Sequence, residues 1–241
     1  MRIIPAIDII DGKCVRLTQG DFAQKKIYND NPLEIAKKFE DAGLKYLHLV
    51  DLDGARAGRV INWKVIESIT GNTSLKVDFG GGIKTEDEIN RLLKAGVQQI
   101  NLGSIAVRDR DLVYHWLELF GPEKIILSAD VKGEFIAIAG WQQNSNISIS
   151  DFLKDYLQQG IQYVTCTDIS TDGMLQGPNV TLYTKILKGF PSIKLIASGG
   201  VSNTQDLENL KKIRVDGVIV GKAIYEGHID LVTLTARSSK Q

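Results

Sequence analysis

Cysteine and histidine are scarce in this chain of 241 residues, and the few that occur do not group. The two cysteines, Cys14 and Cys166, stand far apart in apolar, strand-like segments. Isolated thiols give neither a disulfide framework nor a zinc spacing, so we expect a reducing compartment, the cytoplasm. The three histidines show no metal-ligand spacing, and no dinucleotide or nucleophile motif is present. The sequence therefore predicts a reaction that uses neither a metal nor a cofactor.

An excess of charge of either sign is missing as well. The chain carries 29 basic and 29 acidic residues, so no overall field favours nucleic acid or an anionic membrane. No apolar run approaches the roughly 20 residues of a membrane span, and the first residues lack the apolar core of a signal peptide. We expect a cytoplasmic monomer that binds neither nucleic acid nor membrane.

Short apolar runs alternate with helical patterns along the whole chain. Strands are expected at Ile3–Ile7, Tyr46–Val50, Leu75–Phe79, Gln99–Leu102, Lys124–Ala129, Tyr163–Thr167, Lys194–Ala197 and Val218–Val220. A short extra strand is expected at Cys14–Leu17, a loop at Asp53–Gly58 and an inserted hairpin at Glu134–Trp141. Eight strands alternating with eight helices predict a single-domain α/β barrel, the (β/α)8 or TIM barrel. An open doubly wound sheet is the alternative.

Two stretches, half a chain apart, look like copies of each other. Each has an apolar run followed by Gly-Gly, then a polar helix, then an apolar run that ends on a lone glycine. The same number of residues separates Gly81 from Gly103 and Gly199 from Gly221. This twofold repeat favours a barrel over an open sheet, with half-barrels at about residues 1–122 and 123–241.

The glycines of both copies are candidate phosphate-binding residues. Glycine after a strand lets backbone N–H groups close on an anion, although one Gly-Gly alone is explained by turn geometry. Two matched copies predict a ligand with a phosphate at each end. The candidate residues are Gly81, Gly82, Gly103 and Ser104 in the first copy, and Ser198, Gly199, Gly200, Gly221 and Lys222 in the second.

Aspartates end several of the other predicted strands. Asp8 and Asp130 occupy equivalent places in the two halves, so we expect them to face each other and to move protons as base and acid. Asp172 lies in a Thr-Asp-Gly turn and is either a turn residue or an acid on a mobile loop. For Asp51 and Asp168, chemistry and the binding of loop amides both remain open.

Two further side chains could contact a ligand. Arg16, on the first loop, either reaches a phosphate or is a surface charge. Trp141 follows a glycine in a polar loop, where it either stacks on a planar ligand or packs in the core. His48 lies within a strand and is interpreted as an interior residue.

Several of these segments resemble one known family. Residues Ile4–Leu17, His48–Ala55, Gly80–Ile83, Gly140–Trp141 and Cys166–Gly173 are similar to the phosphoribosylformimino-aminoimidazole-carboxamide ribotide isomerases of histidine biosynthesis. The resemblance implies an Amadori rearrangement that turns an aminoaldose into an aminoketose. It also implies a bisphosphorylated ribonucleotide substrate, in agreement with the two glycine copies.

The resemblance implies roles for individual residues. Asp8 would be the base that takes the C2 proton, and Asp130 the acid that protonates the ring oxygen, with Asp172 as the other candidate for the acid. Trp141 would stack on the imidazole carboxamide. Lys84 stands where the family has arginine, which keeps the charge but loses the bidentate geometry.

Three other functions compete with this interpretation. The cyclase subunit of imidazole glycerol phosphate synthase shares the repeat and both aspartates, but it has lysine where Arg16 stands and needs a glutaminase partner. Isomerisation of phosphoribosyl anthranilate is the same chemistry on a smaller substrate. A non-catalytic barrel that binds phosphometabolites would lack the strand-end carboxylates, which this chain keeps.

Overall fold

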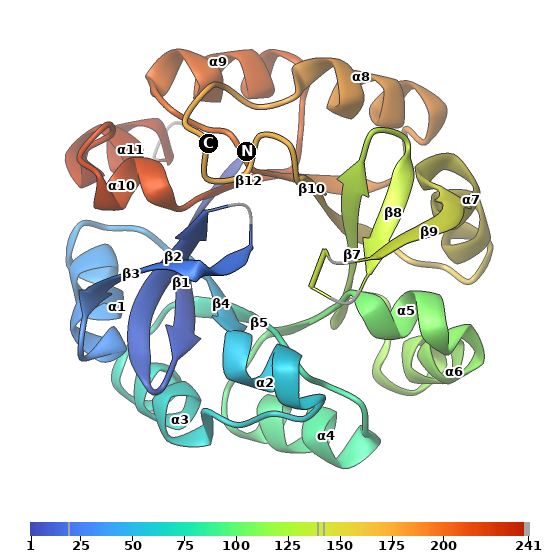
Figure 1. Ribbon diagram of the computed structural model, residues 1–241, viewed down its shortest axis with the longest axis horizontal. Helices are drawn as coiled ribbons and strands as arrows, with labels where there is room; N and C mark the ends of the chain where they lie inside the picture. Colours follow the sequence, from blue (N-terminus) through green and yellow to red (C-terminus); the bar gives the residue numbers. More distant parts are fainter. Residues whose placement is uncertain (19, 139, 142, 239–241) are drawn as a thin grey trace.

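A closed parallel barrel surrounded by helices forms the body of the protein (Figure 1). The computed structural model describes residues 1–18, 20–138, 140–141 and 143–238. The barrel strands are β1 (Arg2–Ile10), β4 (Tyr46–Asp51), β5 (Lys76–Gly80), β6 (Gln99–Leu102), β7 (Ile125–Lys132), β10 (Tyr163–Asp168), β11 (Lys194–Ser198) and β12 (Gly217–Val220). Neighbouring strands pair in parallel, and β12 returns to β1. The predicted barrel is confirmed, and the open sheet is excluded.

In the described part of the chain, eight helices cover the outside of the barrel, and three short ones lie in the loops. The outer helices are α1 (Pro32–Asp41), α3 (Trp63–Asn72), α4 (Glu86–Lys94), α6 (Arg110–Phe120), α7 (Ile149–Gln158), α8 (Val180–Gly189), α9 (Thr204–Lys212) and α11 (Leu231–Ser238). Their starts follow the expected chemistry: Thr85 and Asn203 each form a capping box, and Asn31 caps α1 before Pro32. None of the helices in the described part of the chain has the length and apolar character of a membrane span.

The three short helices were not predicted. They are α2 (Leu52–Ala57), α5 (Ser104–Arg108) and α10 (Lys222–Tyr225). The segment Asp53–Gly58 was expected to be a loop, because glycine and charged residues disfavour a helix when read locally. In the structure the Asp51 carboxylate accepts a hydrogen bond from the Gly54 N–H and caps α2. The formation of α2 therefore depends on a contact with the end of β4 rather than on its own composition.

Two hairpins rise from the barrel on opposite sides of its opening (Figure 1). The first consists of β2 (Lys13–Thr18) and β3 (Asp21–Asn29), and the second of β8 (Phe135–Ile138) and β9 (Gln143–Ser148). The first was expected to be a single strand, because the mostly polar and exposed residues of β3 show no apolar alternation. The second was expected, but its returning strand begins after Trp141 rather than before it.

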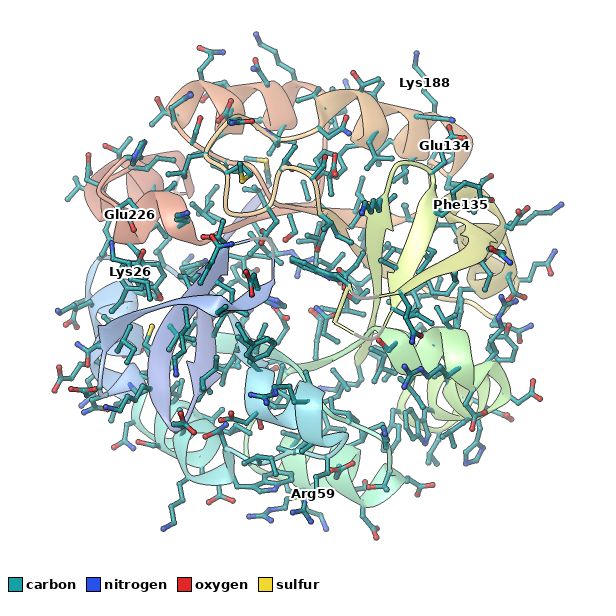
Figure 2. The ribbon with its side chains drawn as sticks, in the orientation of Figure 1. Lys26, Arg59, Glu134, Phe135, Lys188 and Glu226 are labelled. Atoms are coloured by element: carbon teal, nitrogen blue, oxygen red, sulfur yellow. The ribbon has the colours of Figure 1, made fainter. Side chains whose placement is uncertain are left out.

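Ion pairs tie both hairpins to the helical ring. Lys26 on β3 lies beside Glu226, which follows α10, with 2.8 Å between Nζ and Oε1 (Figure 2). Glu134, at the turn into β8, pairs with Lys185 on α8. Each pair is exposed and contributes little energy. The two pairs show that both hairpins contact helices from the second half of the chain.

Apolar packing separates the two ends of the barrel. The larger core lies between strands and helices. A smaller cluster inside the barrel consists of Ile4, Ala6, Ile126, Ile196 and Ile219, packed against Tyr46 and Tyr163. At the N-terminal end Arg2 lies between those two tyrosine rings, 5.5 and 5.1 Å from their centroids, beside an open hollow of about 740 Å³. The strand-end aspartates Asp8 and Asp130 lie at the opposite, carboxyl end of the barrel.

Candidate active site

Three carboxylates meet at the carboxyl end of the barrel. Asp8 lies on β1 and Asp130 on β7, while Asp172 lies in the turn after β10. Burial raises the pKa of Asp172 from its ordinary 3.8 to about 6; Arg16 opposes the rise, and the charges of Asp8 and Asp130 add to it. Like charges that share a poorly hydrated space cannot all ionise easily. Asp172 therefore holds its proton up to a higher pH than an ordinary aspartate does.

Arg16 on β2 binds the first of these carboxylates. Its Nη1 lies 2.9 Å from Oδ2 of Asp8, and the two side chains are only 12% and 14% exposed. Burial works against the cation, but the fields of Asp8 and Asp172 raise the pKa of Arg16 overall. The guanidinium Nε is buried and has no hydrogen-bond partner in the described part of the chain. Arg16 is therefore no surface charge: its guanidinium is held inside the site by the Asp8 carboxylate.

Asp130 has a different environment. Burial raises its pKa, while hydrogen bonds from Trp141 and Thr167 and the charge of His48 lower it. Trp141 lies between β8 and β9 with a positive φ of 70°. A Cβ atom on Gly20, in the facing hairpin, would lie 2.6 Å from the Trp141 ring. The indole thus bridges the two hairpins and reaches Asp130.

The two Gly-Gly turns share a left-handed backbone. The φ angles are 114° and 84° at Gly81 and Gly82, and 93° and 83° at Gly199 and Gly200. A Cβ atom on Gly81 would overlap the carbonyl of Asp51, and one on Gly199 would lie 3.0 Å from the equivalent carbonyl in the second half. Only glycine combines this left-handed backbone with such a close approach.

The lone glycines also match, but their surroundings differ. Gly103 precedes α5 with φ and ψ of −101° and −102°, and Gly221 precedes α10 with −111° and −97°. A Cβ atom on Gly103 would meet Ser128 at an ordinary 3.7 Å, whereas one on Gly221 would overlap the guanidinium of Arg16. The second glycine copy therefore holds an arginine that joins it to Asp8.

A small pocket of about 20 Å³ lies in the second copy. Its lining includes Arg16, Asp172, Ser198, Gly199, Gly200 and Gly221. The Lys222 ammonium donates to the carbonyl oxygen of Gly173 at 2.8 Å and so supports the turn that carries Asp172. In the first copy, Lys84 is exposed and its ammonium lies against Gly58, while Ser104 begins α5.

Asp51 and Asp168, left open by the sequence, bind their own loops. Asp51 is fully buried, and its Oδ2 accepts hydrogen bonds from the N–H groups of Ile61 and Asn62 at 2.8 and 2.9 Å. Asp168 accepts from the amide of Asn179 at 2.6 Å and from the N–H of Ser170 at 2.9 Å. These bonds order the loops that flank the two Gly-Gly turns.

Sequence reasoning missed the partner of His48. His48 on β4 and Asp78 on β5 are paired residues in the strand register, and their side chains form a short contact between Nδ1 and Oδ1. Burial works against the charged ring, but Asp78 and then Asp8 raise the pKa of His48. Both residues look like ordinary members of apolar strands; only the shared inward face of the two strands reveals the pair.

Comparison with known proteins places the chain in a family. A model of the histidine biosynthesis protein family matches residues 2–230. A protein of Flavobacterium johnsoniae and one of Bacteroides thetaiotaomicron are each 55% identical over 234 residues, which is 97% of this chain and 98% of each relative. A protein of Bacteroides fragilis is 52% identical over 236 residues, 98% of this chain and 99% of its own length.

All three relatives carry the same name, 1-(5-phosphoribosyl)-5-((5-phosphoribosylamino)methylideneamino) imidazole-4-carboxamide isomerase. The family match and these identities cover nearly the whole chain, so the resemblance drawn from short motifs extends over the complete barrel. The chain belongs to the histidine biosynthesis protein family.

Proposed function

We infer that this chain is an intramolecular aldose–ketose isomerase of L-histidine biosynthesis. It converts the aminoaldose phosphoribosylformimino-aminoimidazole-carboxamide ribotide into the corresponding aminoketose by an Amadori rearrangement. The observation that carries this is the placement of three carboxylates between two matched glycine copies at one barrel mouth. The relatives' shared name supports the same reaction.

The glycine copies hold the two phosphates of the substrate. Gly81, Gly82, Gly103 and Ser104 bind one phosphate, and Ser198, Gly199, Gly200 and Gly221 bind the other, with Arg16 as its cation. The buried and unpartnered Nε of Arg16 supports this role, because guanidinium donors suit phosphate oxygens. A substrate held at both ends has its reacting sugar near the middle of the mouth.

The carboxylates divide the proton transfers. Asp172 protonates the ring oxygen as the bond between C1 and that oxygen breaks, and the nitrogen lone pair forms the C1=N bond. Asp8 then removes the C2 proton; the released pair forms the C1=C2 bond, and the C=N pair returns to nitrogen. The enaminol gains a proton at C1 and loses one from its hydroxyl, which gives the aminoketose without net oxidation.

The assignment of the acid rests on the environments of the two candidates. A pKa of about 6 lets Asp172 donate a proton near neutral pH. Asp130 accepts hydrogen bonds from Trp141 and Thr167, which favour its ionised form. We therefore assign the acid role to Asp172. Asp130 holds Trp141 in place by accepting its hydrogen bond, and Trp141 stacks on the imidazole carboxamide.

Oligomeric state and compartment are part of the same proposal. The enzyme works as a monomer, since β1, β2, β7 and the turn after β10 of one chain supply Asp8, Arg16, Asp130 and Asp172. Both cysteines are buried free thiols, in keeping with the reducing cytoplasm. Light scattering coupled to gel filtration tests the first statement.

Supplying the purified aminoaldose alone tests the reaction. We expect spectroscopic conversion to the aminoketose in the absence of ammonia and of any glutaminase. No conversion would overturn the isomerase, and a product that requires ammonia would identify the cyclase instead. Conversion of phosphoribosyl anthranilate, measured in parallel, reports a second substrate.

A further inference from the structure

A buried imidazole and carboxylate lie directly beneath the proposed proton-transfer site. The register aligns His48 with Asp78 on β5 and with Ala6 on β1. Because inward-facing positions recur every second residue, His48 lies one layer below Asp8 inside the barrel. Asp78 is 7% exposed, and its Oδ1 also accepts a hydrogen bond from the side-chain amide of Asn101 at 3.4 Å.

His48 is the member of this pair that interacts electrostatically with the strand aspartates of the site. The charge of Asp8 acts on His48, and the charge of His48 acts on Asp130. Arg16 is the cation that opposes the charging of His48. Asp78 supplies the opposing negative charge, and on its lower side it borders the N-terminal hollow with Lys76 and Lys124.

The third carboxylate, Asp172, has a different set of charged neighbours. The largest charge effects on Asp172 come from Arg16, Asp8, Asp130 and Lys222. His48 thus acts on the two strand aspartates from below, whereas Asp172 lies in the turn above them. A cation in that place lowers the cost of ionising Asp8 and Asp130 together, and so separates them from Asp172.

We propose that His48 and Asp78 are positioning residues, a buried imidazolium–carboxylate pair that keeps Asp8 and Asp130 ionised while Asp172 retains its proton. The kinetic part of this proposal rests on the isomerase function inferred above. The protonation state of the pair does not, because it is a property of the ligand-free protein. A purely structural pair would hold β4 to β5 and leave the proton-transfer groups unchanged.

Replacing His48 by glutamine tests the kinetic effect. Without the His48 cation the base needs a higher pH to act, so the acid limb of the pH profile of kcat/KM should move up by about 0.5–1 pH unit. Because this variant leaves the buried Asp78 without its cationic partner, the double variant His48→Gln/Asp78→Asn is measured beside it. It removes both charges but still lacks the cation, so its acid limb should also move up.

Thr165→Val is the matched control. Thr165 lies on β10, is 3% exposed, and has an Oγ1 without a hydrogen-bond partner among the described residues. Its replacement removes a buried hydroxyl from the barrel without changing charge. We expect an acid limb at the wild-type position. A shift equal to that of the His48 variants would mean that any change in the barrel interior moves it, and would overturn the proposal.

Nitrogen NMR of the His48 ring tests the protonation state directly. We expect two protonated ring nitrogens at pH 7.5 in the wild-type protein and a fall in the His48 pKa in Asp78→Asn. A neutral ring at pH 7.5, or an unmoved acid limb in folded His48→Gln and in the double variant, would overturn the proposal. If the wild-type protein converts no substrate, the inferred function fails, while NMR still decides the state of the pair.

Discussion

Nη1 of Arg16 lies 2.9 Å from Oδ2 of Asp8, while the same guanidinium fills the space in which a side chain on Gly221 would stand. One arginine thus connects the proposed base to the second glycine copy. Both sequence copies have a glycine at this point, but among the described residues no arginine meets Gly103 as Arg16 meets Gly221. The two proposed phosphate sites are therefore alike in backbone and unequal in charge.

Asp8→Asn is expected to lower kcat by about 10²–10⁴-fold, because a general base contributes that much. Steady-state rates on the aminoaldose measure the loss, and circular dichroism checks the fold. Asp11→Asn is the control, since Asp11 follows on the same chain segment with its side chain 74% exposed. A rate above about a tenth of wild type in Asp8→Asn would assign the base elsewhere.

Asp172→Asn and Asp130→Asn should differ in their pH profiles. Asp172 acts in its protonated form, and its pKa is about 6, so wild-type activity should fall as pH rises above that value. Asn cannot donate the proton, so Asp172→Asn should lose this alkaline limb and about 10²–10⁴-fold of the rate. Asp130→Asn should be slower but keep the limb. Loss of the limb in Asp130→Asn instead would give Asp130 the acid role.

Gly221→Ala is expected to lower kcat/KM by at least about tenfold, because the new methyl group displaces the Arg16 guanidinium and small misplacements at a reacting site are costly. Gly103→Ala carries nearly the same backbone angles but meets Ser128 at 3.7 Å, so it serves as the matched control. Equal losses in the two variants would show that the contact with Arg16 is not responsible.

Asp172→Asn should also stabilise the fold above pH 6. Because burial raises the pKa from 3.8 to about 6, the folded state binds this proton more tightly than the unfolded chain does. The favourable contribution is complete below about pH 4 and is lost as pH rises through 6, where the buried group must ionise. The gain for the variant should be about 1–3 kcal/mol at pH 7.5 and vanish near pH 4.

Thermal or denaturant unfolding at the two pH values measures this difference. The loss of the Coulombic attraction between Asp172 and Arg16 reduces the gain, which is why the lower end of the range is included. A variant that is less stable than wild type at pH 7.5 would contradict the raised pKa.

Local chemistry gave the barrel and the candidate residues. The eight apolar runs became the eight barrel strands, and Thr85, Asn203 and the glycine turns behave as their residue types require. The half-barrel boundaries stay a prediction. The strand β3 and the short helices α2, α5 and α10 were missed. Tertiary contacts at the barrel mouth stabilise these segments, whose own residues favour neither a helix nor a strand.

The sequence by itself determined the fold class, the matched glycine copies and the carboxylates at strand ends, because these depend on spacing and on backbone preference. Only the tertiary structure decided which charges meet. In the folded protein Arg16 contacts Asp8, and Asp51 and Asp168 accept hydrogen bonds from the loops that follow their strands. The side chains of His48 and Asp78 form a pair. Electrostatic coupling acts through space between residues far apart in the chain, and spacing along one sequence does not record it.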